Sequence, residues 1–562
     1  KKRKFFDLFI IGVVFIALLK TNTRGAFLAL IVTGIIALIL YGMHVMRYTR
    51  KKVPLFLCGA AIVIAAVFYQ QREAVWFSKV MPGLVQRTLR ALHPAALKEQ
   101  RVYFIRTGWE AFKEKPLLGW GQENYLNAFL KYRNQDAVAY KLSYTIWIDR
   151  AHNIIIDTLV ATGLVGLIAY LGIFGVIFFI SFRLWRATRS KKIFVLASSF
   201  FAYFFQNLFT LDTPTSFLMF FFGIGLLNSV YQEQRSAQKI QNDDNRPITN
   251  NYNYVFALIV VAVMSIAVYR FNIIPFLSSR LTIIANATLP VDFRSGMYWY
   301  RKALLYSSPY LLETRVQLAK NILQQYASRL SDISDTTRDA PKTHLTSSDL
   351  SFAIDEMRKN IISDPLNIRY GIWFAQLANT YTSLYDDRYT KEVIERIEKY
   401  LKDGYESQYL YWELGRAKLH QGKKDEVAAL YKKALDLDEG ANESWWYLAY
   451  AYLVMEQYDR AIEPLDMLLA RNYDFNQEDE PLLLVAEAFE KKERWQDAVN
   501  ILLLYIKKHS DDVPANVRAF DYYRRLNDID KGIPYLQKAS ELDPRLREKV
   551  EKIIDENGQN KK

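Results

Sequence analysis

The stretch Ile154–Phe182 reads IIIDTLVATGLVGLIAYLGIFGVIFFISF and contains a single charged residue, Asp157. A helix of about 20 mostly apolar residues is long enough to cross a lipid bilayer. This stretch exceeds that length, and its apolar residues follow one another too continuously for a helix with one solvated face. The sequence therefore predicts a membrane-spanning helix here and a membrane protein around it.

Six further apolar stretches accompany this one and predict seven crossings in all. Basic clusters at Lys1–Lys4, Arg47–Lys52 and Arg183–Lys192 fall on alternate connectors, as the positive-inside rule requires. The predicted topology places the N-terminus and the polar linker 232–253 in the cytoplasm and everything after the last crossing outside. The seven stretches are Phe5–Leu19, Ala26–Val45, Val53–Tyr69, Ile154–Phe182, Ile193–Leu211, Thr215–Val230 and Tyr254–Tyr269.

Charge divides the chain into two unlike halves. The 562 residues carry a net charge of +14. Residues 1–270 hold 32 basic and 13 acidic side chains, a net of +19, whereas residues 271–562 hold 41 and 46, a net of −5. This division excludes a single basic soluble domain, and the 51% hydrophobic content excludes a disordered chain. The single cysteine, Cys58, excludes a disulfide framework and a cysteine-based zinc site.

The predicted domains follow from these boundaries. Residues 1–231 form a transmembrane domain with a long outer loop at 71–152, residues 232–253 a cytoplasmic linker, residues 254–270 the last crossing, and residues 271–562 an outer helical-repeat domain. The loop 71–152 has 13 basic and 7 acidic residues. Its net charge of +6 suits either a solvated loop or a site for an anionic, membrane-held substrate. Because the chain starts with Lys1 rather than Met, we also expect further membrane helices to have preceded it.

A repeat of 34 residues is clearest over 409–544. Positions such as Tyr411, Leu414 and Val427 recur 34 residues later as Trp445, Leu448 and Ala461. Large and small apolar residues alternate between polar turns, which resembles the tetratricopeptide repeat of two antiparallel helices. Looser units are expected around 298–309 and 352–365, with a polar loop at Ser328–Ser351. Such arrays bind another protein or an extended chain more often than they perform chemistry.

Three short motifs fall on connectors that the topology places outside. Thr21-Asn-Thr-Arg24-Gly-Ala26 opens the second membrane helix, where helix amides and Arg24 together favour an anion such as phosphate. RVYFIRTGWEAFKEKPLLGWG, from Arg101 to Gly121, predicts a short amphipathic helix that ends at Pro116 and a turn with two glycines. Ala151-His152-Asn153 precedes the fourth membrane helix, where a histidine can act as a general base near neutral pH.

Each motif alone also has an ordinary structural explanation. Arg24 could anchor its helix at the interface, Arg101 and Arg106 could be solvated surface residues, and His152 could be structural. Arg106 lies about 140° around the helix from Arg101, so the two need not face the same group. The outer connectors contain no close carboxylate pair of the kind that holds a divalent metal, so we expect no metal.

Taken together, these motifs resemble the O-antigen ligase family of bacterial membrane glycosyltransferases. The resemblance covers about residues 20–230, corresponding to the family's C-terminal conserved portion, and rests on Thr-Arg-Gly-Ala, then Arg-x4-Arg-x2-Trp-x6-Pro-Leu-Leu-Gly-x-Gly, then His-Asn-x9-Gly. Members with a tetratricopeptide tail outside the membrane are familiar. The resemblance implies an all-α, GT-C-like multi-helix membrane fold, here shortened at its N-terminus, followed by an α-solenoid.

The resemblance also implies a chemistry. Such enzymes take a glycan from undecaprenyl pyrophosphate on the outer face of the cytoplasmic membrane and transfer it to an acceptor hydroxyl, without metal or cofactor. Arg24 and Arg101 would then bind the pyrophosphate, with Arg106 as a weaker candidate for the same task. His152 would remove the acceptor proton, and Asn153 would support its orientation.

Two alternatives stay open at this point. Within the same family, the chain could be a polymerase that extends a lipid-linked glycan, or it could transfer the glycan to a protein. Outside the family's chemistry, it could be a membrane scaffold that displays a repeat array to a protein partner. The enzyme hypothesis predicts that Arg24, Arg101 and His152 converge, and the scaffold hypothesis predicts that they are scattered. Neither predicts a nucleic-acid partner.

Overall fold

The computed structural model describes residues 24–49, 100–133, 148–240, 252–332, 345–475 and 481–560. All regular structure in these ranges is helical, which confirms the predicted all-α class. Two of the predicted crossings, Phe5–Leu19 and Val53–Tyr69, lie outside the described residues, as does Cys58. Chain contacts divide the protein into two compact units, residues 1–249 without a short stretch at 143–145, and residues 250–562 with that stretch.

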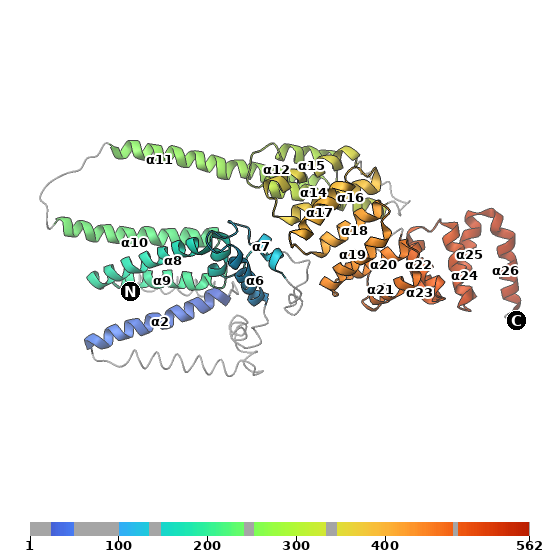
Figure 1. Cartoon of the computed structure of the whole chain (residues 1–562), viewed down its shortest axis with the longest axis horizontal. Helices are drawn as coiled ribbons and strands as arrows, with labels where there is room; N and C mark the ends of the chain where they lie inside the picture. The colour runs from blue at the N-terminus through green and yellow to red at the C-terminus, as the bar shows by residue number, and fades with distance from the viewer. Residues whose placement is uncertain are drawn as a thin grey trace, which may run out of the picture. The chain divides into compact units, whose positions relative to one another are not determined.

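The first unit is a bundle of long apolar helices with two short helices at one end (Figure 1). Its long helices are α2 (Arg24–Thr49), α8 (Ile154–Thr188), α9 (Lys191–Asn207) and α10 (Pro214–Ile240). The two short ones, α6 (Gln100–Glu114) and α7 (Tyr125–Tyr132), pack against each other and against α8.

Three helical runs in the described residues are long and apolar enough to cross a membrane: Ile154–Thr188, Pro214–Arg235 and Tyr254–Thr288. Many of their large apolar side chains point outward, including Ile168 at 63% exposed and Phe222 at 63%. Such side chains are stable facing lipid rather than water. Helices α2 and α9 also form where crossings were predicted, but α9 has only 17 residues and the apolar core of α2 spans Leu28–Leu40.

Aromatic and branched side chains hold α8, α9 and α10 together. A buried cluster of Ile177, Leu184, Ile193, Phe200 and Leu227 draws on all three helices. The rings of Tyr203 and Phe220 stack with centroids 4.8 Å apart, within the range at which aromatic pairs add to the area they bury. The hairpin α8–α9 and the following helix α10 therefore form one packed layer.

The second unit is a succession of helical pairs, which agrees with the predicted α-solenoid. After α11 (Tyr252–Val268) and a π-helical turn at Tyr269–Ile273, the helices are α12 (Ile274–Thr288), α13 (Phe293–Ala303), α14 (Leu311–Asp332), α15 (Ser347–Ser363), α16 (Ile368–Leu384), α17 (Thr390–Lys402), α18 (Gln408–His420), α19 (Lys424–Leu437), α20 (Asn442–Val454), α21 (Tyr458–Ala470), α22 (Pro481–Lys491), α23 (Trp495–Lys508), α24 (Val513–Arg525), α25 (Ile529–Leu542) and, after a 3₁₀ turn at Pro544–Leu546, α26 (Arg547–Asn560).

The 34-residue repeat corresponds to pairs of these helices. Helix α18 packs on α19, α20 on α21, α22 on α23 and α24 on α25. The recurring apolar positions are buried, for example Val427, Ala461 and Ala498, which have no exposed surface. At Gly415 an added Cβ would come within 2.2 Å of the Tyr431 ring, so the small residue is needed where α18 and α19 cross.

Two predicted boundaries can be compared with the helices. The last predicted crossing ends at Arg270, and the helical backbone continues past it through the π-helical turn into α12, whose face with Pro275 and Ser278 is buried. The prediction made Ser328–Ser351 a loop, whereas α14 extends to Asp332 and α15 begins at Ser347. Thr346 and Asp349 form a capping box at that start, so local capping favours the helix over the loop.

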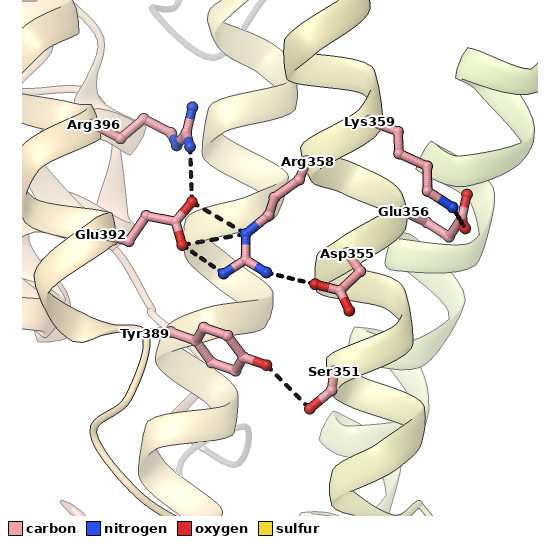
Figure 2. A network of polar contacts seen from close by, with 8 residues as sticks. All are labelled: Ser351, Asp355, Glu356, Arg358, Lys359, Tyr389, Glu392 and Arg396. Atoms are coloured by element: carbon pink, nitrogen blue, oxygen red, sulfur yellow. Dashed lines mark hydrogen bonds and ion pairs between the residues drawn. The ribbon is translucent and has the colours of Figure 1, made fainter.

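Charged side chains join the helices of the earlier, looser repeats. Figure 2 shows Arg358 of α15 between Asp355 and Glu392, with Arg396 on the other side of Glu392. The Tyr389 hydroxyl donates a hydrogen bond to Ser351 at 3.1 Å in the same interface. These contacts connect α15 with α17, and Arg358 and Glu392 lie 34 residues apart, the same spacing as in the later repeat.

Candidate functional site

Helix α6 carries two of the arginines that the sequence singled out, and its apolar face positions it. Tyr103, Phe104 and Gly108 of α6 are buried, and the Tyr125 hydroxyl of α7 donates a hydrogen bond to the Phe104 carbonyl at 2.6 Å. A Cβ on Gly108 would come within 2.5 Å of Ile156, so α6 lies directly against the start of α8. The opposite face leaves Arg101 and Arg106 exposed.

The turn after α6 docks into a break in α8. Gly163 has φ of 67°, outside helical values, and this interrupts the hydrogen-bond ladder of α8. The amides of Trp120 and Gly121 donate to the carbonyls of Val160 and Ala161 at 2.7 and 2.9 Å. In return, the amides of Leu164 and Val165 donate to Pro116 and Leu117 at 2.8 and 3.3 Å.

This docking explains the glycines of the second and third motifs. A Cβ on Gly119 would come within 2.5 Å of the Val160 carbonyl oxygen, and one on Gly163 within 2.2 Å of the Leu117 oxygen. Both residues also have positive φ, which favours glycine. The prediction placed Gly119 in a turn and Gly163 inside a helix, but it did not pair the two.

His152 lies in a tight turn just before α8. Its φ of 55° is in the left-handed region, which histidine enters more readily than branched residues do. The preceding amide of Ala151 donates to Asp157 at 2.6 Å, and the following Asn153 caps α8 by accepting from the amides of Ile155 and Ile156. Since its neighbours on both sides are held, the position of His152 is defined by α8 itself.

The connector between α9 and α10 brings the second and third motifs together. Arg101 donates from Nη1 to the Phe209 carbonyl at 3.2 Å. Asn153 donates from Nδ2 to the neighbouring Leu208 carbonyl at 3.1 Å. Two adjacent backbone carbonyls therefore accept hydrogen bonds from both motifs, and the His152 ring lies 6.1 Å from that of Phe104 on α6.

Asp212 organises this connector, although it belongs to none of the three sequence motifs. Its carboxylate accepts hydrogen bonds from Tyr203 at 2.6 Å, Asn207 at 3.0 Å and Ser216 at 2.9 Å. Two of these donors lie near the end of α9 and the third at the start of α10, so Asp212 joins the two helices across the connector. A signal existed in the sequence, since Asp212 is an acidic residue within a short connector between two apolar helices.

The surroundings of His152 favour the neutral form of its imidazole. Burial of the ring, and after that the positive charge of Arg101, lower the pKa of His152 below the usual 6.5, while Asp149 partly opposes them. A neutral imidazole at pH 7 can accept a proton, and a guanidinium beside it can stabilise an anion. This arrangement suits removal of a proton next to a site of developing negative charge.

The structure brings some of the predicted site residues together and leaves others apart. Arg101, His152 and Asn153 come together at one connector. Arg106 is exposed on α6, and it is not among the groups that shift the pKa of His152. Arg24 begins α2, and its side chain lies outside the part of the chain that is described. Within that part, no three His, Cys, Asp or Glu side chains are grouped so that they could hold a metal ion.

Comparison with known proteins supports the resemblance. Residues 9–171 match the family model described as O-antigen ligase. No curated protein matches the chain. Solved structures similar to parts of it include MamA of AMB-1, with 16% identity over 31% of this chain and 98% of that one at a TM-score of 0.25. YrrB, "a TPR protein with an unusual peptide-binding site", has 16% identity over 34% of this chain and 92% of that one at a TM-score of 0.28.

Proposed function

From an O-antigen ligase domain at residues 9–171, joined to an α-solenoid of tetratricopeptide type, we propose that this membrane protein transfers a glycan from a polyprenyl-pyrophosphate carrier to an acceptor hydroxyl on the outer face of the cytoplasmic membrane. The observation that carries the proposal is the shared connector: Arg101 and Asn153 bond to Phe209 and Leu208, with His152 beside them. The scaffold alternative does not require these motifs to meet.

In the proposed reaction, His152 takes the proton of the acceptor hydroxyl as its oxygen attacks the anomeric carbon. The bond between that carbon and the pyrophosphate oxygen breaks, and the electron pair leaves with the pyrophosphate. Arg101, with Arg24 in the same role, offsets the charge that develops there. The donor is already activated, so one base and these cations account for the step.

The other residues have supporting roles in this proposal. Asn153 orients the turn that carries His152, and Asp212 holds the connector against which Arg101 lies. Arg106 meets the outer part of the pyrophosphate or the glycan. The helical repeats, on the same side of the membrane, bind a protein or an extended glycan and so bring an acceptor close.

Replacement of His152 tests the proposal most directly. His152→Asn keeps a residue that tolerates the left-handed backbone but removes the base. We expect transfer from a lipid-linked glycan in membrane vesicles to fall by about a hundredfold or more, the usual contribution of a general base, with unchanged thermal stability. His509→Asn, in the repeat domain, is the matched control and should leave the rate unaltered.

A His152→Asn protein that transfers glycan at the wild-type rate would remove His152 from the mechanism. The product of the same assay separates the family's two reactions. Transfer to a distinct acceptor supports the ligase, and a longer glycan on the same carrier supports the polymerase.

A further inference from the structure

A cavity of about 810 Å³ lies between α2, α8 and α9, within the first unit. This volume is within the range of about 300–1,000 Å³ that is usual for ligand sites. Most of its wall is apolar, with side chains such as Ile36, Phe178, Ile193 and Phe201. None of the residues considered in the catalytic proposal lines it.

One end of the cavity is strongly basic. Arg186, near the end of α8, and Arg189, in the turn before α9, line it, and Arg183, Lys191 and Lys192 lie in the adjoining ends of the two helices. Arg186 is exposed, and no carboxylate among the described residues forms an ion pair with it. Helix α9 begins at this turn, and its N-cap residue, Ser190, makes no side-chain capping hydrogen bond. Free amides at a helix start attract anions, so the backbone adds to the side-chain charge.

Two buried hydroxyl groups in the wall have no hydrogen-bond partner in the described part of the chain. They belong to Thr33 of α2, 8% exposed, and Ser181 of α8, 2% exposed. A buried polar group without a partner is costly, so a rotation of either side chain that turns its hydroxyl into the cavity would let an oxygen acceptor of a ligand stabilise it. Ser181 lies five residues before Arg186, about 7.5 Å along a helix, which is deeper in the bundle than the basic end.

From these features we propose that the cavity binds an anionic phospholipid. Its phosphate lies between Arg186 and Arg189, its ester oxygens lie at the depth of Ser181, and one acyl chain fills the apolar part. Basic pockets between membrane helices recognise anionic headgroups in this way. The amphipathic order of the cavity, charged at one end and apolar beyond, matches a phospholipid better than a free phosphate or an apolar molecule. The site is separate from that of the proposed glycan transfer.

Native mass spectrometry of the purified, delipidated full chain tests this, with phosphatidylglycerol and phosphatidylcholine as probes. We expect phosphatidylglycerol to bind at least tenfold more tightly. The double variant Arg186→Gln/Arg189→Gln should bind it about thirtyfold more weakly, the equivalent of about 1 kcal/mol for each arginine. The control Arg183→Gln/Lys192→Gln removes the same charge from the same turn without changing the lining, and it should retain the preference.

Ala197→Phe tests the apolar part of the cavity without a change of charge. Ala197 lines the cavity, so a phenyl ring there should exclude the acyl chain and abolish binding. Three results would each overturn the proposal: equal affinity of the wild type for the two lipids, an equal loss of phosphatidylglycerol affinity in the two double variants, or wild-type phosphatidylglycerol affinity in Ala197→Phe. Size-exclusion chromatography and thermal unfolding confirm that each variant is folded, and the two lining variants test the site independently.

Discussion

At the scale of single residues, the proposed site depends on the contacts that fix the backbone of His152. Its left-handed backbone costs about 1–3 kcal/mol for a residue that is not glycine. The Ala151 amide bonded to Asp157 and the Asn153 cap of α8 offset that cost on either side. The turn therefore presents the imidazole at a defined place beside Arg101.

The effect of Arg101 on His152 predicts a shift in pH dependence. The Arg101 charge lowers the pKa of His152, so Arg101→Gln should raise that pKa. In the proposed mechanism transfer requires the neutral imidazole, so it should be lost as pH falls through this pKa. The acidic limb of kcat/KM against pH should therefore move to higher pH in Arg101→Gln.

Asp149→Asn supplies the opposite test. Asp149 raises the pKa of His152, so its neutralisation should move the acidic limb to lower pH, whereas Arg101→Lys, which retains the charge, should leave the limb in place. An acidic limb that stays at the same pH in both Arg101→Gln and Asp149→Asn would show that His152 does not control the rate.

At the scale of secondary structure, the break in α8 and the turn Pro116–Gly121 form one unit. Four backbone hydrogen bonds between them take the place of those that α8 loses at Gly163. Buried backbone groups are nearly always paired, so neither half is stable there without the other. The same interaction brings the C-terminal end of α6 to α8.

Glycine substitutions in α8 test this interdependence. Gly163→Ala places a Cβ within 2.2 Å of the Leu117 oxygen at a positive φ, so we expect a lower thermal unfolding temperature and loss of transfer. Gly172→Ala, in the same helix, meets nothing within 4 Å and should change neither property. If Gly163→Ala is as stable and as active as Gly172→Ala, the turn is not essential to the site.

At the scale of the whole molecule, the charge pattern and the helices predict which side each part occupies. The proposed reaction requires His152 and the repeat domain to lie outside, and the basic α8–α9 turn to lie inside. The described residues contain three helical runs able to cross a membrane, and these do not by themselves orient the chain.

Single cysteines test that orientation, because the chain has only Cys58. In a Cys58→Ser background, Ser510→Cys of the repeat domain should react with a membrane-impermeant maleimide on intact spheroplasts. Ala187→Cys, at the basic end of α8, should react only after permeabilisation. Both positions are exposed. Labelling of Ala187→Cys in intact spheroplasts would show that the topology is the reverse of the predicted one. The proposed catalytic site at His152 would then face the cytoplasm.

Local patterns in the sequence determined much of this protein: the helical class, the apolar spans, the helical pairs from Gln408 to Leu542, and the individual motifs with Arg101 and His152. These follow from hydrophobic length and period, which neighbouring residues set. The extension of the helix beyond Arg270 and the helical ends of the 328–351 segment escaped prediction, because capping and packing outweigh composition there.

Only the tertiary structure decided which distant residues meet. It placed Arg101 and Asn153 on adjacent carbonyls, paired Gly119 with the break at Gly163, and gave Asp212 its place at the connector. No sequence period relates these positions, since each contact depends on how α6, α8 and α9 pack. Backbone groups released at Gly163 must find partners in a low-dielectric setting, and the turn from another segment supplies them.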